Sequence, residues 1–279
     1  MKKNLMLIIK GFVFGIANII PGVSGGTIAL TLGVYEDFIY AISHLFKEFK
    51  NSLKFLLPFG IGAASAILLM SKAINYALIH HPFATTLLFI GLIIGGIPFL
   101  TRNVKNNKIK PSYILLFLLS FIIVIAMSFG NTNVKEVTLT NPNILTYITL
   151  LIVGVVAAAT MVIPGISGSF VLVLLGYYGP IVNTISNLTK LENLTTNISI
   201  LLVFGIGVLL GIILVSKLIE YLFNKHKVKT YYAILGFILA SIITLAATLT
   251  GVYMSTKEII IGLILLIIGF IAGYKLGDE

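Results

Sequence analysis

The stretch Ile20-Pro21-Gly22-Val23-Ser24-Gly25-Gly26 returns later in the chain as Ile163-Pro164-Gly165-Ile166-Ser167-Gly168-Ser169. Each copy lies between two apolar segments and has the composition of a tight turn. Proline lacks an amide donor, glycine permits positive φ, and serine is a preferred helix N-cap. We therefore expect a helix, a tight turn and a second helix at both places, with Ser24 capping a helix that begins near Gly25.

The repeat extends beyond these turns. Leu32-Gly33-Val34-Tyr35 returns as Leu175-Gly176-Tyr177-Tyr178, and residues 56–78 match 201–223 at 12 of 23 positions. Two unrelated Leu- and Ile-rich helices would share fewer identities, so we predict two related halves, 1–140 and 141–279. We expect hairpins at 5–46 and 144–186, followed by helices at 56–78, 84–100 and 113–130 in the first half, and at 200–223, 231–250 and 259–274 in the second.

The composition indicates an all-α polytopic membrane protein. Of 279 residues, 58% are hydrophobic and 10% charged, and the mean hydropathy is +1.09. A soluble domain needs about 25% charged residues to face water, and apolar runs near 20 residues suit a bilayer. The net charge of +10 would suggest nucleic acid in a soluble protein. Here it is explained by topology, so we expect no nucleic-acid partner.

The basic residues predict the orientation in the membrane. With a cytoplasmic N-terminus, fourteen of the nineteen Lys and Arg residues fall on the cytoplasmic side and three on the other. Basic residues in short loops mark the cytoplasmic side of a membrane protein, so we expect both termini inside. Because each half has five apolar segments, an odd number, the second half must insert upside down. Inverted repeats with a site near the membrane midplane are a transporter architecture.

The first arm of the first hairpin is short for a membrane span. Residues 5–20 contain Lys10, Gly11, Gly15 and Asn18, which leaves an apolar stretch below the roughly 20 residues that a span needs. We therefore favour re-entrant hairpins over pairs of full spans, and apply the same interpretation to 144–186. Two full spans would give the same sidedness, so the alternative stays open.

If the hairpins enter from opposite sides, their tips meet near the middle of the membrane. Free amides at helix starts, glycines and hydroxyl groups then form a site for an anion, particularly a phosphate. The alternative is that the small residues only allow close helix crossing. The candidate substrate-binding residues are Asn18, Pro21, Gly22, Ser24, Gly25, Gly26, Thr27, Pro164, Gly165, Ser167, Gly168 and Ser169.

The motif Asn18 to Thr27 with Leu32-Gly33-Val34-Tyr35, and its echo in the second half, resembles the bacterial polyprenyl-phosphate transporter family of the PopT type. The resemblance covers nearly the whole chain. It implies a protein that returns undecaprenyl phosphate, the lipid carrier of cell-wall precursors, from the outer to the inner leaflet. Membrane lipids and the lipid phosphate are the partners this implies, with no cofactor and no metal; the oligomeric state is left open.

Three other classes compete with this interpretation. Undecaprenyl-pyrophosphate phosphatases carry a similar turn with a catalytic arginine, but Gly25 and Gly168 stand at that position and Arg102 is the only arginine. We therefore expect no catalytic residues. A small-anion permease or channel remains the main alternative, and a non-catalytic membrane scaffold is the third.

A few charged residues are candidates for ion coupling or for a phosphate relay. Lys72 and Lys217 are equivalent in the repeat and lie near helix ends, where long side chains also snorkel to the interface. Glu220 follows Lys217 by one turn and is expected to be its partner. Glu36 and Asp37 follow the first Leu-Gly-Val-Tyr block, where the second half has Gly179 and Pro180, and this asymmetry is compatible with a proton site or with an interfacial helix end.

Overall fold

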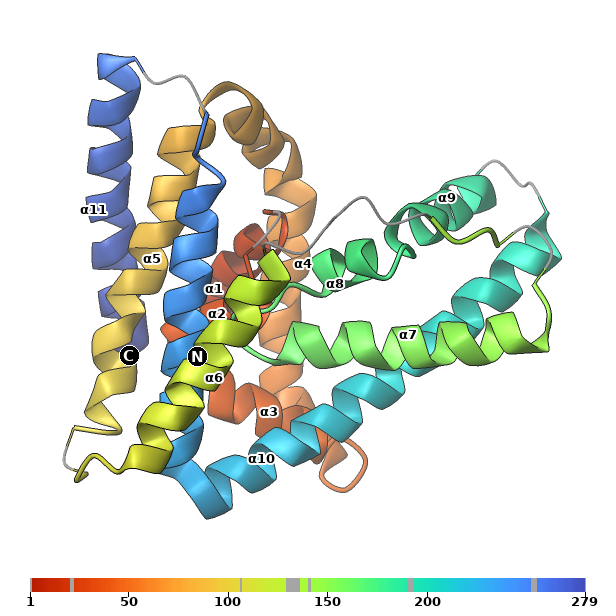
Figure 1. Cartoon of the computed structure of the whole chain (residues 1–279), viewed down its shortest axis with the longest axis horizontal. Helices are drawn as coiled ribbons and strands as arrows, with labels where there is room; N and C mark the ends of the chain where they lie inside the picture. The colour runs from red at the N-terminus through yellow and green to blue at the C-terminus, as the bar shows by residue number, and fades with distance from the viewer. Residues whose placement is uncertain are drawn as a thin grey trace.

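The computed structural model describes residues 2–20, 23–105, 107–128, 136–139, 142–189, 193–251 and 255–278, and in these ranges every regular element is helical (Figure 1). This confirms the predicted all-α class. The helices are α1 (Lys2–Asn18), α2 (Gly25–Thr31), α3 (Tyr35–Ser43), α4 (Phe49–His80), α5 (Pro82–Arg102), α6 (Pro111–Ser128), α7 (Ile144–Val162), α8 (Gly168–Leu174), α9 (Tyr178–Thr189), α10 (Leu194–Ala247) and α11 (Thr256–Asp278).

Six helices in the described ranges are long and apolar enough to cross a bilayer: α4, α5, α6, α7, α10 and α11. Their outer faces are strongly apolar, with Leu68 of α4 83% exposed, as suits a surface that meets lipid rather than water. The chain is therefore a polytopic membrane protein. Helix α1, with 17 residues, is too short to count among these membrane-spanning helices. Helix α7, which the sequence predicts as one arm of a hairpin, has 19 residues and is long enough to span.

The second arm of each predicted hairpin is broken into two helices, which corrects the expectation of a single second helix in the hairpins at 5–46 and 144–186. Gly33 ends α2 with φ +67°, and Gly176 ends α8 with φ +74°. The amides of Gly33 and Val34 bond to the carbonyls of Leu30 and Ala29, and the equivalent bonds form after α8. This is the Schellman pattern, in which glycine accepts the left-handed conformation without steric cost. Helices α8 and α9 are bent by 106° to each other.

Helix α10 joins two segments that the sequence predicts as separate helices. Its 54 residues would be about 80 Å long if straight, far more than one span. The backbone at His226 is non-helical, with φ −136° and ψ 40°, and the helix turns sharply there (Figure 1). The hydroxyl of Thr230 lies 3.1 Å from the carbonyl oxygens of both Leu222 and His226. It thereby satisfies acceptors that the kink leaves without helical donors.

Equivalent helices pair in equivalent ways. Helix α1 packs along α4, and α7 packs along the first part of α10. At these contacts a side chain on Gly11 would collide with the carbonyl of Phe59, and one on Gly154 with that of Phe204. Residues 11 and 154 are equivalent in the repeat, as are 59 and 204. Small residues at both crossings let the two backbones approach closely.

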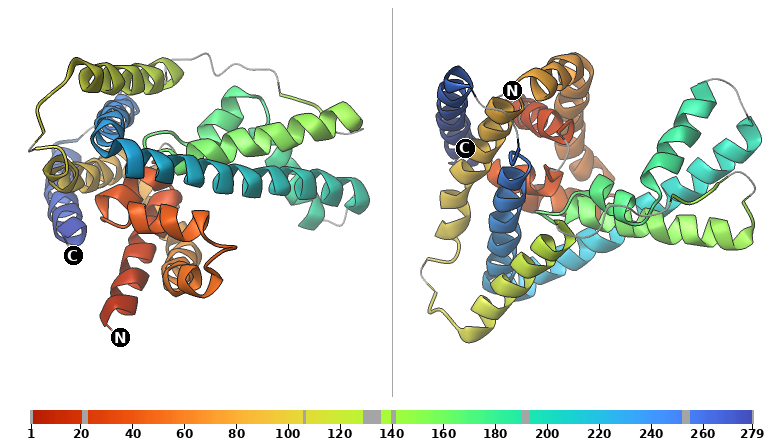
Figure 2. Two further views of the ribbon diagram at one scale, coloured as in Figure 1. Left: turned by 90° about the horizontal axis from the view of Figure 1, so that it is seen from below. Right: turned by 45° about the horizontal axis from the view of Figure 1, so that its top comes forward.

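The remaining helices pair across the two halves. Helix α5 packs along α11, and α6 packs along the second part of α10. The views in Figures 1 and 2 agree that α7 and the first part of α10 run side by side, steeply inclined to α4, α5 and α11. Equivalent helices of the two halves therefore make equivalent contacts, although they do not all run in the same direction.

The main hydrophobic core joins both halves around α2. Ile28 and Leu30 are at most 2% exposed and belong to the same cluster as Ile93 of α5 and Ile238 of α10. This core holds α2 in the middle of the molecule. The turn that precedes α2 is positioned as a result.

Candidate functional site at the two turns

The two sequence-repeated turns touch each other directly. The amide of Gly165 donates to Thr27 Oγ1 at 2.7 Å, and Ser24 Oγ donates to the carbonyl of Ile163 at 3.4 Å. The hydroxyl of Tyr35 donates to the carbonyl of Val162 at 3.0 Å. Segments far apart in the chain therefore meet through hydrogen bonds between partly or fully buried groups, which are stronger in a low-dielectric interior than in water.

A close backbone approach accompanies these bonds. A Cβ atom on Gly26 would lie 2.8 Å from the carbonyl oxygen of Val162 and 3.1 Å from the nitrogen of Pro164. Gly26 therefore fits where a larger residue would push the turns apart. Pro21 and Gly22, which the sequence places in this site, lie outside the described residues.

A cavity of about 600 Å³ lies beside the joined turns and takes residues from both. Its volume is in the range of small-molecule sites. Of the predicted binding residues, it is lined by Asn18, Ser24, Gly25, Gly26, Ser167, Gly168 and Ser169. The rest of its wall is largely apolar and comes from α1, α3, α7, α8 and their flanks.

Both serines occupy the predicted N-cap positions, but not with the expected side-chain bonds. Helix α2 begins at Gly25 after an extended Ser24, and α8 begins at Gly168 after an extended Ser167. Neither serine side chain caps its own helix; Ser24 bonds across to Ile163, and Ser167 Oγ lies 2.9 Å from Ser169 Oγ. First-turn amides have no acceptor within their own helix, and the residues that begin α2 and α8 line this cavity.

Three of the predicted binding residues lie beneath the cavity rather than on its wall. Thr27 is fully buried and accepts the Gly165 amide, and Pro164 is also buried. Gly165 has φ +83°, a conformation that side chains rarely adopt. These residues hold the two turns in register, whereas the serines and the glycines at the helix starts face the cavity.

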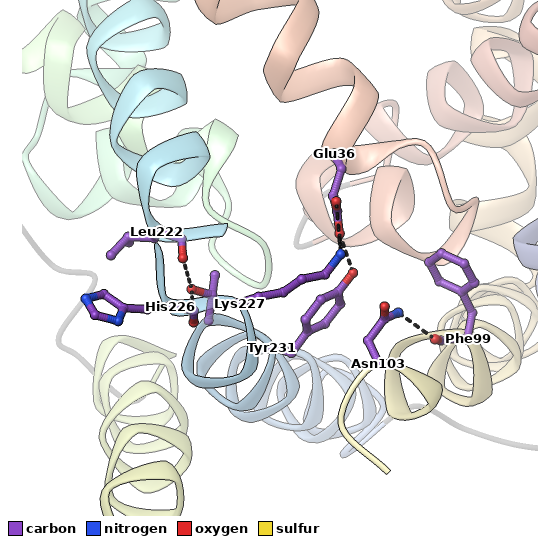
Figure 3. A network of polar contacts seen from close by, with 8 residues as sticks. Glu36, Phe99, Asn103, Leu222, His226, Lys227 and Tyr231 are labelled. Carbon is purple, nitrogen blue, oxygen red and sulfur yellow. Dashed lines mark hydrogen bonds and ion pairs between the residues drawn. The ribbon is translucent and has the colours of Figure 1, made fainter. Parts of the chain in front are cut away.

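The acidic candidates lie at the contact between α3 and α10, and Figure 3 shows one of them, Glu36, with its partners on α10. Tyr231 donates to Glu36 Oε1 at 2.6 Å, and Lys227 Nζ lies 3.3 Å from the same oxygen. On the other side of the kink, Ser43 Oγ donates to Glu220 Oε2 at 2.5 Å. Helix α3 is thus bonded to α10 both before and after His226.

His44 also belongs to this cluster, although no sequence motif marks it as a candidate. Its Nδ1 lies 3.5 Å from Glu220 Oε1, and its ring stacks on that of Tyr40. Glu220 therefore faces α3, not Lys217 as the sequence suggested. Glu36, Asp37 and Glu220 also line one cavity of about 230 Å³.

The two repeat-equivalent lysines take no part in the cavity between the turns. Lys72 and Lys217 are both exposed, on α4 and α10, and the lining of that cavity comes from other residues. This placement favours snorkelling to the membrane interface, in which the aliphatic part of a lysine side chain contacts lipid.

Nearby, at the end of α3, the carboxylate of Glu48 is held by hydrogen bonds. Asn51 Nδ2 and the Tyr40 hydroxyl both donate to it, and these bonds hold the pKa of Glu48 below its ordinary value. Glu48 therefore stays charged at neutral pH, adding a fixed negative charge next to His44.

Comparisons with known proteins agree on one family. A family profile described as undecaprenyl phosphate translocase-like matches residues 14–261. A polyprenyl-phosphate transporter of Staphylococcus aureus is 38% identical over 276 residues, covering 97% of this chain and 95% of that protein. A polyprenyl-phosphate transporter of Vibrio cholerae is 30% identical over 249 residues, covering 84% and 75% of the two chains. No solved structure matches the chain significantly.

Proposed function

The chain belongs to the undecaprenyl phosphate translocase-like family, and from this membership we propose that it transports polyprenyl phosphate across the bacterial cytoplasmic membrane. We further propose the direction from the outer to the inner leaflet, which returns the carrier lipid for another round of cell-wall precursor synthesis. The names of two relatives, one of them aligned along nearly its full length, support the substrate class. The protein acts in this proposal as a flippase and not as an enzyme.

The phosphate group is proposed to bind in the cavity between the two turns. The observation that carries this proposal is that one cavity takes Ser24, Gly25, Ser167 and Gly168 from turns about 140 residues apart. The serine hydroxyls and the amides of the first helical turns can donate hydrogen bonds to the phosphate, although none of these groups carries a full positive charge. Helices α2 and α8 have only seven residues each, so these local donors, which dominate the effect of a helix end, carry the attraction.

The two halves are proposed to be inverted repeats, with both termini in the cytoplasm. Support comes from the equivalent glycine contacts of α1 with α4 and of α7 with α10, together with the odd number of apolar segments in each half. The basic residues support the orientation. In this arrangement the joined turns lie between the halves, where a site can be exposed to each leaflet in turn.

Ion coupling is proposed on energetic grounds. A phosphate monoester carries about −1.5 to −2 charges at neutral pH, and each charge crossing 100 mV is worth about 2.3 kcal/mol. Inward movement against an inside-negative potential therefore costs roughly 3 to 5 kcal/mol per 100 mV. Protons that accompany the substrate offset this cost. Glu36, Asp37 and Glu220 are the proposed proton carriers because they share one cavity at the contact between the halves.

This coupling predicts that Glu220→Gln uncouples transport from the pH gradient. The neutral amide keeps the shape of the side chain but cannot exchange a proton. In proteoliposomes, the variant is expected to move polyprenyl phosphate down its own gradient while an imposed pH gradient no longer changes the rate. Glu258→Gln, which removes a carboxylate that contacts His81, is the matched control. An unchanged response of Glu220→Gln to the pH gradient would contradict the role of Glu220.

A proteoliposome assay with the unmodified chain tests the function itself. Movement of labelled polyprenyl phosphate between leaflets, without phosphate release and without anion current, is the expected result. Release of inorganic phosphate would indicate a phosphatase, and an anion current would indicate a channel. The absence of all three activities would favour a scaffold.

A further inference from the structure

A second cavity adjoins the one between the turns. It has a volume of about 360 Å³ and lies between the end of α6, the end of α10 and the second turn. Ile166, Ser167 and Phe170 line both cavities. The two cavities therefore share part of their wall, and a molecule held at the two turns lies beside this second space.

The wall of the second cavity is apolar. Val124 of α6 is 4% exposed, and Leu245 of α10 is 3% exposed. Met127 and Phe170 complete the surface, and methionine and aromatic side chains adapt well to flexible apolar ligands.

Apart from Ser167, which also lines the cavity between the turns, the hydroxyl groups on this wall are hydrogen-bonded within their own helices or the turn that follows α10. Ser128 Oγ donates to the carbonyl of Val124 at 2.9 Å, Thr244 Oγ1 to that of Ser241 at 3.0 Å, and Thr248 Oγ1 to that of Leu245 at 2.6 Å. Each hydroxyl has a single proton to donate. The cavity therefore offers little hydrogen bonding to a polar ligand and selects an apolar one.

One edge of this cavity reaches the outer surface of the molecule. Ile243 is 42% exposed, although Leu245, two residues on, is almost fully buried. The wall thus continues from the interior to a surface that meets lipid. A long apolar chain that extends out of this cavity can therefore follow an apolar surface toward the bilayer.

We propose that the second cavity binds the isoprenoid chain next to the phosphate while the phosphate occupies the cavity between the turns. This inference rests on the proposed function and adds the site for the tail. The cavity is too small for a long polyprenyl chain, so the far end of the chain stays in the bilayer. The protein then recognises a phosphate with an apolar chain attached, not a free phosphate ion.

A filling substitution tests this assignment on the full-length chain. Ala247→Phe places a ring in the second cavity, whereas Ala246→Phe adds the same ring at the neighbouring exposed position, which is not part of the lining. We expect Ala247→Phe to weaken binding of a long polyprenyl phosphate by about tenfold or more and to leave binding of methyl phosphate, which carries no isoprene unit, unchanged. Ala246→Phe should bind both like the unmodified chain.

The outcomes separate the tail site from the function. Unchanged binding of both ligands by Ala247→Phe would overturn the tail site and leave the phosphate site standing; equal loss of both would also overturn it. If the unmodified chain binds neither phosphate, the proposed function fails. A photoreactive group on the first isoprene unit provides a second measurement on the unmodified chain. Crosslinks are expected at Met127 or Phe170, and crosslinks confined to α11 would contradict the proposal.

Discussion

Gly25 and Gly168 occupy the same place in the two turns and face equivalent neighbours. A Cβ on Gly25 would lie 2.8 Å from Asn18 Oδ1 and 3.1 Å from the ring of Phe14. A Cβ on Gly168 would meet Met161 and lie 2.9 Å from the carbonyl oxygen of Ala157. Residues 18 and 161 are equivalent in the repeat, and so are 14 and 157. Both glycines thus keep the first arm close to the start of the second.

This geometry predicts that leucine at either glycine abolishes transport. Gly25→Leu or Gly168→Leu should lower the rate at least about tenfold and cost roughly 1–3 kcal/mol of stability through overpacking. Leaflet exchange in proteoliposomes and thermal unfolding in detergent measure the two effects. Gly60→Leu and Gly205→Leu are the controls, because a Cβ at either position has no neighbour within 4 Å among the described residues. Normal transport by both turn variants would contradict a phosphate site at the turns.

The sequence predicts this site in part. The turns, the helix starts at Gly25 and Gly168 and the serine N-cap positions can be read from local chemistry. The bond from Gly165 to Thr27 and the contact of His44 with Glu220 cannot. They join segments far apart in the chain, and their geometry depends on how whole helices pack.

The short helices α2 and α8 differ most from the prediction. Their apolar sequence continues past Leu32 and Leu175, so composition alone suggests helices of full length. Leu-Gly-Val-Tyr and Leu-Gly-Tyr-Tyr nevertheless carry the pattern of a helix end, with glycine at the first position beyond the cap and an apolar residue after it. The sequence therefore contains a helix-end pattern at both places, but the apolar residues that continue past it favour the prediction of one long helix.

The break after α2 predicts a stability effect. Gly33→Ala must place an alanine at φ +67° and bring its Cβ to 2.8 Å from the carbonyl oxygen of Gly277. Gly251→Ala meets a similar φ of +84°, but none of the residues that the structure describes lies within 4 Å of its Cβ. The left-handed conformation costs about 1–2 kcal/mol in both variants, and the clash adds to it only in the first. Thermal unfolding should therefore show a larger loss for Gly33→Ala; an equal loss would contradict the close contact between α2 and α11.

At the scale of the whole molecule, the pairing of α5 with α11 and of α6 with α10 binds the two halves together. The sequence predicts ten apolar segments and their order. It does not predict which helices pair across the halves, nor the steep inclination of α7 and the first part of α10 (Figure 2). Those features depend on side-chain fit between helices that are all similarly apolar, and periodicity carries no information about that fit.

Because α5 packs on α11 and α6 packs on α10, each half lacks its packing partners when made alone, and we predict that neither half is stable by itself. Fragments 1–140 and 141–279 should be degraded when made separately and should purify together when made in the same cell. Gly269→Leu in the second fragment removes the space that α11 gives to the backbone of α5 at Leu88 and should prevent association, whereas Gly205→Leu should not. A first fragment that is stable and monodisperse by itself would contradict the prediction.

The pairing of α5 with α11 also means that one helix is made well before its partner during synthesis. The glycine face of α5, at Gly91 and Gly95, is filled by Leu266 and Phe270 of α11. About 150 residues separate the two helices, and at roughly 5–20 residues per second the ribosome needs about 10–30 s to make them. During that interval α5 sits in the bilayer without its partner. The nascent chain is therefore most vulnerable to membrane proteases and most dependent on insertion chaperones before its last helix has entered.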